Sequence, residues 1–231
     1  MPMEILAMID VHKIMGKLHV LRGLSFSLGS GEFVVIRGRS GSGKTTLCRI
    51  SALLERPSSG YVVFMGEDPF SKQDVWKLRL GSIGYIPQFH ELVSSLTIGE
   101  NIELPLRLLG MPKETRRRVV GEISRRLGIE KILDRFPGEV SGGEAQRAAI
   151  ARALAKGPLL LVADEPFSHL DDHSEKLARE LFKEHIESGG AILMTTTELG
   201  KSYGEMRGLC IYQGRLKECG SVDNDDRGAY V

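Results

Sequence analysis

Eight consecutive residues combine glycines with a lysine and a threonine in the order that a phosphate-binding loop requires. Residues 38–45 read GRSGSGKT and match the pattern G-x-x-x-x-G-K-[ST] at every position. Glycines let such a loop curl with its backbone N–H groups turned inward, and the N-terminus of a following helix adds partial positive charge. In this chemistry Lys44 reaches the β- and γ-phosphates of a nucleotide, and the Thr45 hydroxyl binds Mg²⁺. We expect nine residues to contact the nucleotide here: Gly38, Arg39, Ser40, Gly41, Ser42, Gly43, Lys44, Thr45 and Thr46.

The residues on either side of this loop supply the strand and the helix that must position it. The apolar run at 33–36 is typical of a buried strand. Apolar residues then follow the loop at helical spacing: Leu47, Ile50, Leu53 and Leu54. A Gly/Ser-rich turn without function would not need this context. The flanking pattern therefore favours phosphate binding.

Two adjacent carboxylates follow a second buried strand. Residues 159–163 read LLLVA, a run typical of a strand buried on both faces of a parallel sheet, and Asp164 and Glu165 come directly after it. Because ligands bind at the carboxyl ends of such strands, we expect Asp164 to face the Mg²⁺ held by Thr45. Glu165 points to the other side of the strand end, where a carboxylate can activate the water that attacks a γ-phosphate. Glu165 is the candidate general base.

A third segment combines a helix start with two glycines. Ser141 and Glu144 have the spacing of a capping box, and a helix is expected over 145–155. The cap does not explain Gly142 and Gly143, because adjacent glycines weaken a helix start. Close approach of the backbone to a phosphate does explain them.

Composition excludes several classes of protein. The chain has 231 residues, 26% of them charged, and a formal net charge of +1, so we expect no nucleic-acid partner. The N-terminal residues lack the features of a signal peptide, and no apolar run reaches the roughly 18 residues that span a bilayer. Cys48, Cys210 and Cys219 follow no zinc or C-x-x-C spacing, which predicts unpaired thiols in a reducing compartment and a cytoplasmic protein.

Helix and strand patterns alternate along the chain and predict an α/β fold with a mostly parallel sheet. Short strands at 5–11, 24–28 and 61–64 predict a small antiparallel sheet beside it. From residue 91 onward the pattern becomes chiefly helical, which predicts an inserted helical subdomain. We expect a single domain over 1–231, built from a nucleotide-binding core with the antiparallel part (1–88 and 158–220), the helical subdomain (89–157) and a mobile tail (221–231).

The order of these segments resembles the ATP-binding-cassette (ABC) ATPases. Residues 140–147 (VSGGEAQR) are similar to the signature motif of that family, and Gln88 and the segment 168–171 (SHLD) stand in the matching places. The resemblance covers nearly the whole chain. Three shorter stretches resemble the branch with lipoprotein-releasing and macrolide-export ATPase subunits: GEFV at 31–34, ENIELPL at 100–106 and ADEP at 163–166.

This resemblance implies ATP and Mg²⁺ as ligands and a P-loop NTPase core. Gln88 would touch Mg²⁺ and its water and couple the nucleotide to a membrane-spanning partner, while Asp171 would lie at a dimer contact. Glu165, Lys44 and Gln88 would be the catalytic residues. In the family two copies enclose two ATP molecules, so the signature residues Ser141, Gly142, Gly143 and Glu144 would act on the partner's nucleotide.

The chain departs from the family pattern at three positions. Met15 stands where an aromatic residue would stack on adenine, and a thioether cannot stack as a ring does. Glu144 replaces the usual glutamine of the signature. The switch histidine that follows the 191–195 strand is absent, and its place falls on Thr196 or Thr197.

We therefore expect the ATP-hydrolysing subunit of an export-type ABC transporter, peripheral on the cytoplasmic face of the membrane. Its partners would be an integral membrane permease and a second ATP-binding subunit, in a homodimer or a heterodimer. Three alternatives remain at this point: a soluble ABC-type ATPase with a non-transport partner, a weakly hydrolysing half of a heterodimer, and a P-loop kinase. The kinase would leave residues 141–144 and Gln88 unexplained.

Overall fold

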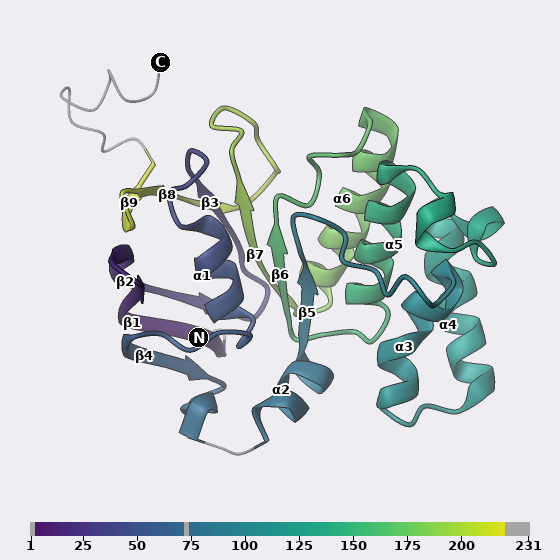
Figure 1. Ribbon diagram of the computed structural model, residues 1–231, viewed down its shortest axis with the longest axis horizontal. Helices are drawn as coiled ribbons and strands as arrows, with labels where there is room; N and C mark the ends of the chain where they lie inside the picture. The colour runs from purple at the N-terminus through teal and green to yellow at the C-terminus, as the bar shows by residue number, and fades with distance from the viewer. Residues whose placement is uncertain (1–2, 72–73, 220–231) are drawn as a thin grey trace.

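The computed structural model describes residues 3–71 and 74–219, so the tail expected over 221–231 lies outside the described residues. The described chain forms two sheets, and helices pack on both faces of the larger one (Figure 1). The expected α/β fold, with a mostly parallel sheet and a small antiparallel sheet, is confirmed.

The small sheet has the strand order β2-β1-β4. β1 (Glu4–Met15) and β2 (Leu18–Gly29) form a hairpin that turns at Gly16, whose φ of +60° suits glycine. β4 (Ser59–Phe64) pairs with the other edge of β1. Both hairpin strands are longer than predicted, because pairing continues through the polar residues near the turn, where no apolar pattern marks a strand.

The large sheet has the strand order β5-β6-β7-β3-β8-β9, and β9 alone runs antiparallel to its neighbour. Alternate residues point to opposite faces, so Val34 and Ile36 pack on one side and Val35 on the other. The strands are β3 (Phe33–Arg37), β5 (Ile83–Ile86), β6 (Leu160–Asp164), β7 (Ala191–Thr196), β8 (Arg207–Tyr212) and β9 (Arg215–Glu218).

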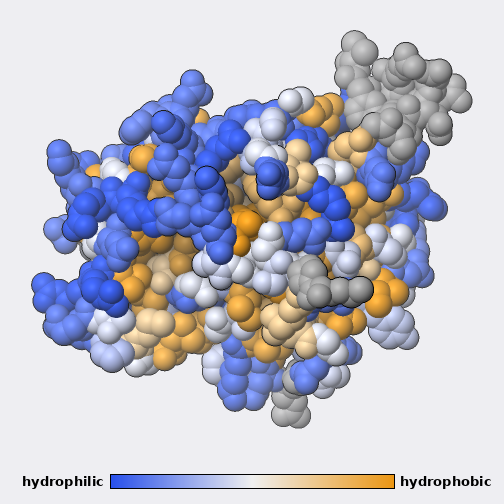
Figure 2. All heavy atoms as spheres, turned by 180° about the vertical axis from the view of Figure 1, so that it is seen from behind, coloured by the Kyte–Doolittle hydropathy of each residue, from blue (hydrophilic) through white to orange (hydrophobic). Residues whose placement is uncertain are grey.

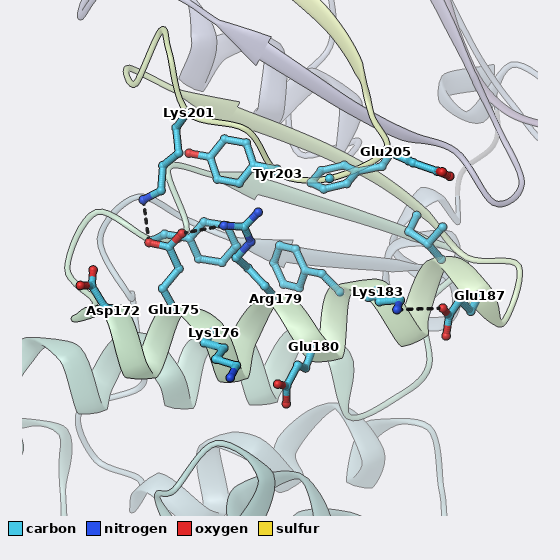
Figure 3. Close-up of a pocket in the computed structure, with 15 residues that line it drawn as sticks. Asp172, Glu175, Lys176, Arg179, Glu180, Lys183, Glu187, Lys201, Tyr203 and Glu205 are labelled. Atoms are coloured by element: carbon cyan, nitrogen blue, oxygen red, sulfur yellow. Dashed lines mark hydrogen bonds and ion pairs between the residues drawn. The ribbon is translucent and has the colours of Figure 1, made fainter.

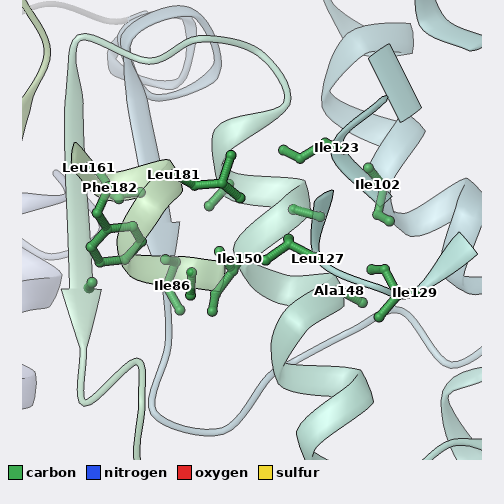
Figure 4. Packing of buried hydrophobic residues seen from close by; sticks show 14 of the residues in the cluster. Ile86, Ile102, Ile123, Leu127, Ile129, Ala148, Ile150, Leu161, Leu181 and Phe182 are labelled. Carbon is green, nitrogen blue, oxygen red and sulfur yellow. The ribbon is translucent and has the colours of Figure 1, made fainter. Parts of the chain in front are cut away.

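Helices on the two faces belong to two separate apolar cores. α1 (Lys44–Ser51) packs with the antiparallel sheet on the Val34 face. On the Val35 face α6 (Asp172–Glu187) and α5 (Gly142–Leu154) pack against the sheet and against each other, as Figure 4 shows for Ile150, Leu181 and Phe182. α3 (Ile98–Leu108) and α4 (Lys113–Arg126) pack against α5. The remaining helical elements are α2 (Val75–Ser82) and three short 3₁₀ turns, η1 (Pro69–Ser71), η2 (Glu130–Ile132) and η3 (Pro137–Glu139).

Two helices differ from the sequence-based expectations. α1 ends at Ser51, before the predicted apolar positions Leu53 and Leu54. α2 was not predicted, and none of its described residues is buried, so no apolar stripe marked it as a helix.

The prediction of unpaired thiols was wrong for two of the three cysteines. Cys210 and Cys219 form a disulfide with their Cα atoms 5.2 Å apart, while Cys48 is free and buried. The β8–β9 hairpin pairs Leu209 with Glu218, which brings Cys219 next to Cys210. This pairing depends on the hairpin register, and spacing rules for zinc and redox motifs do not detect it. The cysteines therefore give no support for a reducing compartment.

Apolar side chains reach the surface in several places. The view from behind shows hydrophobic residues exposed between hydrophilic ones, and the upper part of the helical side is mostly hydrophilic (Figure 2). Exposed examples include Trp76, Leu108 and Tyr61. In residues 3–71 and 74–219, no helix combines the length and the apolarity needed to cross a membrane.

Candidate functional site

Four parallel strands bring the predicted site residues to one edge of the large sheet. β3 leads into the loop at Gly38, β6 ends at Asp164, β7 ends at Thr196 and β5 leads to Gln88. The register pairs Asp164 with Thr195 and Arg37 with Thr196, so these strand ends lie at the same level. This edge is the carboxyl edge of the parallel strands, where α/β sheets bind their ligands.

The structure requires glycine in the 38–45 loop for two different reasons, a lack of space at one position and a positive φ angle at two others. A Cβ on Gly38 would lie within 2.8 Å of Ser42 Oγ and of the backbone oxygen of Ile211, so the position has no room for a side chain. Gly41 and Gly43 have φ angles of +77° and +105°, which other residues rarely adopt. Gly43 is the N-cap of α1 and makes no side-chain cap bond, so the N–H groups of the first turn stay available to an anion.

Lys44 lies inside the loop rather than in solvent. Its side chain is 5% exposed, and Nζ donates to the backbone oxygens of Gly38 at 2.9 Å and Arg39 at 3.1 Å. Nζ also lies 3.3 Å from Oε1 of Glu165, which joins the loop to the end of β6. The sequence placed both residues in one site, and the structure brings them into contact.

Asp164 has one oxygen that no hydrogen bond in the described chain uses. The hydroxyl of Thr195 donates to Oδ1 at 2.5 Å, while Oδ2 is buried and has no protein partner. Among the described residues, no cluster of histidine, cysteine or acidic side chains could hold a metal by itself. A single carboxylate fits Mg²⁺, because this ion usually takes one or two carboxylates and completes its shell with water and substrate phosphates. Asp164 and the exposed Thr45 therefore fit a magnesium nucleotide.

Thr195 is a site residue that the sequence analysis missed. It is fully buried, and its hydroxyl orients the Asp164 carboxylate from the neighbouring strand. Cys48 contacts the same hydroxyl at 3.6 Å, and burial raises the pKa of this thiol well above its ordinary value. A threonine at the end of an otherwise apolar strand was the available signal, and only the register of β6 and β7 shows which carboxylate it meets.

Glu165 adopts a backbone conformation that is unusual for a residue with a side chain. Its φ is +49°, and such a conformation costs of order 1–3 kcal/mol and persists only where neighbouring groups enforce it. Its N–H donates to the oxygen of Thr195, and its oxygen accepts from the N–H and hydroxyl of Ser168. This turn directs the carboxylate toward Lys44.

The two threonines after β7 differ in what they contact. Thr197 is exposed, and its hydroxyl donates to Oε2 of Glu165 at 3.3 Å. Thr196 is buried, with its hydroxyl 3.4 Å from that of Tyr203 and accepting from the N–H of Glu198 at 3.0 Å. Of the two candidate positions, Thr197 is the one whose side chain reaches the Glu165 carboxylate.

The capping box at the start of α5 is present as predicted. Ser141 Oγ accepts from the N–H of Glu144, and the Glu144 carboxylate accepts from the backbone N–H of Ser141 at 2.8 Å. The carboxylate accepts from the backbone N–H and also from the hydroxyl of Ser141, and these two bonds lower the pKa of Glu144. Gly143 comes close to the next segment, because a Cβ there would lie 3.1 Å from the oxygen of His169. Ser141 and Gly142 are exposed, so a second molecule can reach them.

The signature segment does not join the loop site of its own chain. α5 belongs to the core on one face of the sheet and α1 to the core on the other, and Figure 1 shows β5, β6 and β7 between them. The described residues therefore contain a loop site and a signature segment as two separate surfaces.

The other predicted site residues lie at the border of this edge. Gln88 is half-buried two residues after β5, and Met15 is 53% exposed at the end of β1. The Met15 hairpin packs against the loop, since a Cβ on Gly43 would lie 2.8 Å from Leu21. Asp171 is the N-cap of α6, and accepting a hydrogen bond from Ser174 lowers its pKa.

A cavity of about 900 Å³ lies away from the loop, on the α6 face of the sheet (Figure 3). Phe33, Phe167, Phe182 and Tyr203 give it an apolar floor, and charged side chains of α6 surround it. The phosphate-binding loop and the carboxylates lie outside this cavity, so a search by cavity volume alone would not have found the candidate site.

Comparisons with known proteins agree with the site described above. The family model described as ABC transporter matches residues 21–168. The lipoprotein-releasing system ATP-binding protein LolD of Aquifex aeolicus is 41% identical over 197 residues, which cover 84% of this chain and 88% of that protein. The macrolide export ATP-binding/permease protein MacB of Nitrosomonas europaea is 35% identical over 202 residues, covering 87% of this chain and 31% of that longer protein.

A solved structure agrees with the sequence relatives. A dimeric ATP-binding cassette in a post-hydrolysis state, bound to ADP and Pi, is 31% identical and has a TM-score of 0.85. The match covers 94% of this chain and all of that one. The chain belongs to the ABC transporter family and is an ATP-hydrolysing, ATP-binding subunit of that family.

Proposed function

We propose that the 38–46 loop binds ATP with Mg²⁺ and that Glu165 activates the water that attacks the γ-phosphate. The contact between Lys44 and Glu165 carries this proposal, because it places a cation for phosphate beside a carboxylate at the strand edge. Thr45, Asp164 and Gln88 would hold Mg²⁺, which neutralises phosphate charge when bound. Met15 would lie beside the base without stacking on it.

Two copies of such a subunit would form the working unit. Residues 141–144 are separate from the loop of their own chain and exposed at Ser141 and Gly142, so they can complete the site of a second copy. A dimeric relative bound to ADP and Pi supports this arrangement. Asp171, exposed beside the same segment, would lie at the dimer contact. The second copy is either identical or a different subunit that carries a histidine in place of Thr197.

An integral membrane permease is the proposed partner, with the chain on the cytoplasmic face of the membrane. We assign residues 1–88 and 158–220 to the nucleotide-binding core and 89–157 to the helical subdomain, and the permease would dock where they meet. A groove there is lined by Ala52, Leu54, Trp76, Arg79, Leu80, Ile83, Tyr85 and Leu108.

The groove suits an apolar segment and is linked to the nucleotide site. Trp76 and Leu108 are 49% and 63% exposed and line the same groove, so they form an exposed apolar surface together rather than singly. Tyr85 lies in β5, the strand that leads directly to Gln88. MacB is a macrolide export ATP-binding/permease protein, and LolD belongs to a lipoprotein-releasing system, so we propose transport of the export type.

Substitutions at Lys44 and Glu165 should affect different steps, ATP binding in the first case and ATP hydrolysis in the second. Lys44→Ala should lose ATP binding, because it removes the buried cation. Glu165→Gln should keep ATP binding and lose about 10²–10⁴ in hydrolysis rate, so an ATP-bound dimer should accumulate with doubled mass in solution. Titration calorimetry, phosphate release and light scattering measure the three effects. Glu187→Gln, at an exposed carboxylate on α6, is the matched control. Hydrolysis by Glu165→Gln at the parent's rate would exclude Glu165 as the base.

The threonine at the switch position should make hydrolysis slow. Its hydroxyl can donate a hydrogen bond but cannot carry positive charge, and loss of one such donor costs roughly 10²–10³ in rate. Turnover would then fall from an ordinary value of about 10 s⁻¹ to roughly 0.01–0.1 s⁻¹. Thr197→His should raise the rate of the purified protein, whereas Thr196→His should not, because Thr196 is buried and bonded to Tyr203. Rapid turnover by the parent, with no gain from either exchange, would contradict the slow site and the histidine-bearing partner.

The docking groove gives a test of the transport role. The tagged chain, purified from detergent-solubilised membranes, should carry a protein with several membrane-spanning helices. The double variant Trp76→Asp/Leu108→Asp should lose that protein and keep ATP binding. Tyr61→Asp, at an exposed apolar position on β4, should retain it. A membrane protein retained by the double variant would contradict docking in the groove, and a soluble partner instead would favour a non-transport ATPase.

A further inference from the structure

One face of α5 runs along the segment that connects β6 with α6. Gly143 approaches the oxygen of His169, Gln146 donates to the oxygen of Pro166, and Arg147 donates to Ser174. Gln146 and Arg147 come three and four positions after Gly143, which places all three residues on one side of the helix. The helix that presents the signature segment therefore also holds the turn that contains Glu165.

The contact from Gln146 is fully buried. Its side chain has no exposed surface, and Nε2 lies 3.1 Å from the oxygen of Pro166. A carbonyl oxygen can only accept, so the amide nitrogen must be the atom that faces it. The other end of the amide, Oε1, is buried and has no partner in the described chain.

Packing alone does not explain a glutamine at this place. The neighbouring buried positions of α5 are apolar, among them Ala145, Ala149 and Ile150. A buried amide with one unsatisfied end is unfavourable, so an apolar side chain of the same size would serve the core better. What the glutamine adds is the hydrogen bond to Pro166.

Pro166 follows the one residue of this turn that has a left-handed backbone. Glu165 keeps its φ of +49° only because its surroundings enforce it. Thr195 and Ser168 fix the N–H and the oxygen of Glu165, and Gln146 fixes the next carbonyl along the chain. With three sides held, the carboxylate keeps its place between Lys44 and Thr197.

We infer that Gln146 is a positioning residue for Glu165: its buried amide holds the turn after β6 in the conformation that directs the carboxylate at the nucleotide. This inference rests on the proposed role of Glu165. Because its side chain has no exposed surface, Gln146 would not contact the nucleotide or the attacking water directly. Its effect passes through the Pro166 carbonyl, so it should act on the rate of the chemical step and leave ATP binding unchanged.

The test is a double-mutant cycle between Gln146→Met and Glu165→Gln. Methionine has nearly the length and volume of glutamine and no amide, so it removes the hydrogen bond with little change in packing. Single-turnover hydrolysis of radiolabelled ATP measures the step, and calorimetry measures ATP binding. Gln146→Met should lower the hydrolysis rate by about 10-fold to 10²-fold, because displacement of a catalytic group by about 1 Å costs up to about 10²-fold. The dissociation constant for ATP should stay within a factor of about two of the parent's, well below that change in rate.

The cycle separates the possible failures. In the Glu165→Gln background, Gln146→Met should cause no further loss, because the two residues act on the same step. An equal loss in both backgrounds, or an unchanged rate in Gln146→Met alone, would overturn the inference. If Glu165→Gln itself hydrolyses like the parent, the proposed function fails instead.

Two further variants control for stability. Ile150→Val trims a buried residue of α5 that has no polar contact with the turn, and it should hydrolyse ATP at the parent's rate. Gln146→Asn keeps an amide that is one carbon shorter, too short for the bond to Pro166, so it should be slow as well. If Gln146→Met does not fold, Gln146→Asn takes its place in the cycle. Parent-like hydrolysis by Gln146→Asn would contradict the inference.

Discussion

The contact between the Lys44 ammonium and the Glu165 carboxylate holds the two halves of this site together. A buried cation costs several kcal/mol unless acceptors surround it, and Lys44 finds them in two loop carbonyls and one carboxylate. That requirement ties the first turn of α1 to the end of β6. An incoming phosphate can replace part of this shell, because it offers the same negative charge to the same nitrogen. The ion pair is thus a resting arrangement of the groups proposed to bind ATP.

Each group around this pair is fixed from a different strand or helix. Thr195 on β7 orients Asp164 on β6, Thr197 reaches Glu165 from beyond the end of β7, and Gln146 on α5 holds the turn from the opposite side. The carboxyl edge of a parallel sheet makes this possible, since it brings segments that are distant in sequence to the same level. A rigid scaffold of this kind holds the charges in place before the nucleotide arrives.

Most of what the sequence predicted about the fold and the site came from local patterns. The loop glycines, Lys44 and the Asp164–Glu165 pair follow from short motifs next to apolar runs, and the alternation of helix and strand predicts the fold. The features that sequence reasoning missed depend on pairing between distant segments: Thr195 opposite Asp164, the Gln146 bond to Pro166, and the disulfide across the β8–β9 hairpin. α2 was missed for another reason: only Val75 and Leu78 pack against the core and neither is fully buried, so the helix has no clear apolar stripe. The sequence left the switch position ambiguous between Thr196 and Thr197. Only the directions of the two side chains in the structure distinguish them.

The free oxygen of Asp164 offers the most direct test of the account that a magnesium nucleotide binds at this edge. Calorimetry should compare ATP binding with Mg²⁺ and with a chelator, for the parent and for Asp164→Asn. We expect Mg²⁺ to tighten ATP binding by the parent and this gain to disappear in Asp164→Asn, because the buried Oδ2 has no other partner in the described chain. A variant that keeps the full gain from Mg²⁺ would contradict the placement of the metal at Asp164, and with it the proposed magnesium nucleotide site beside Glu165.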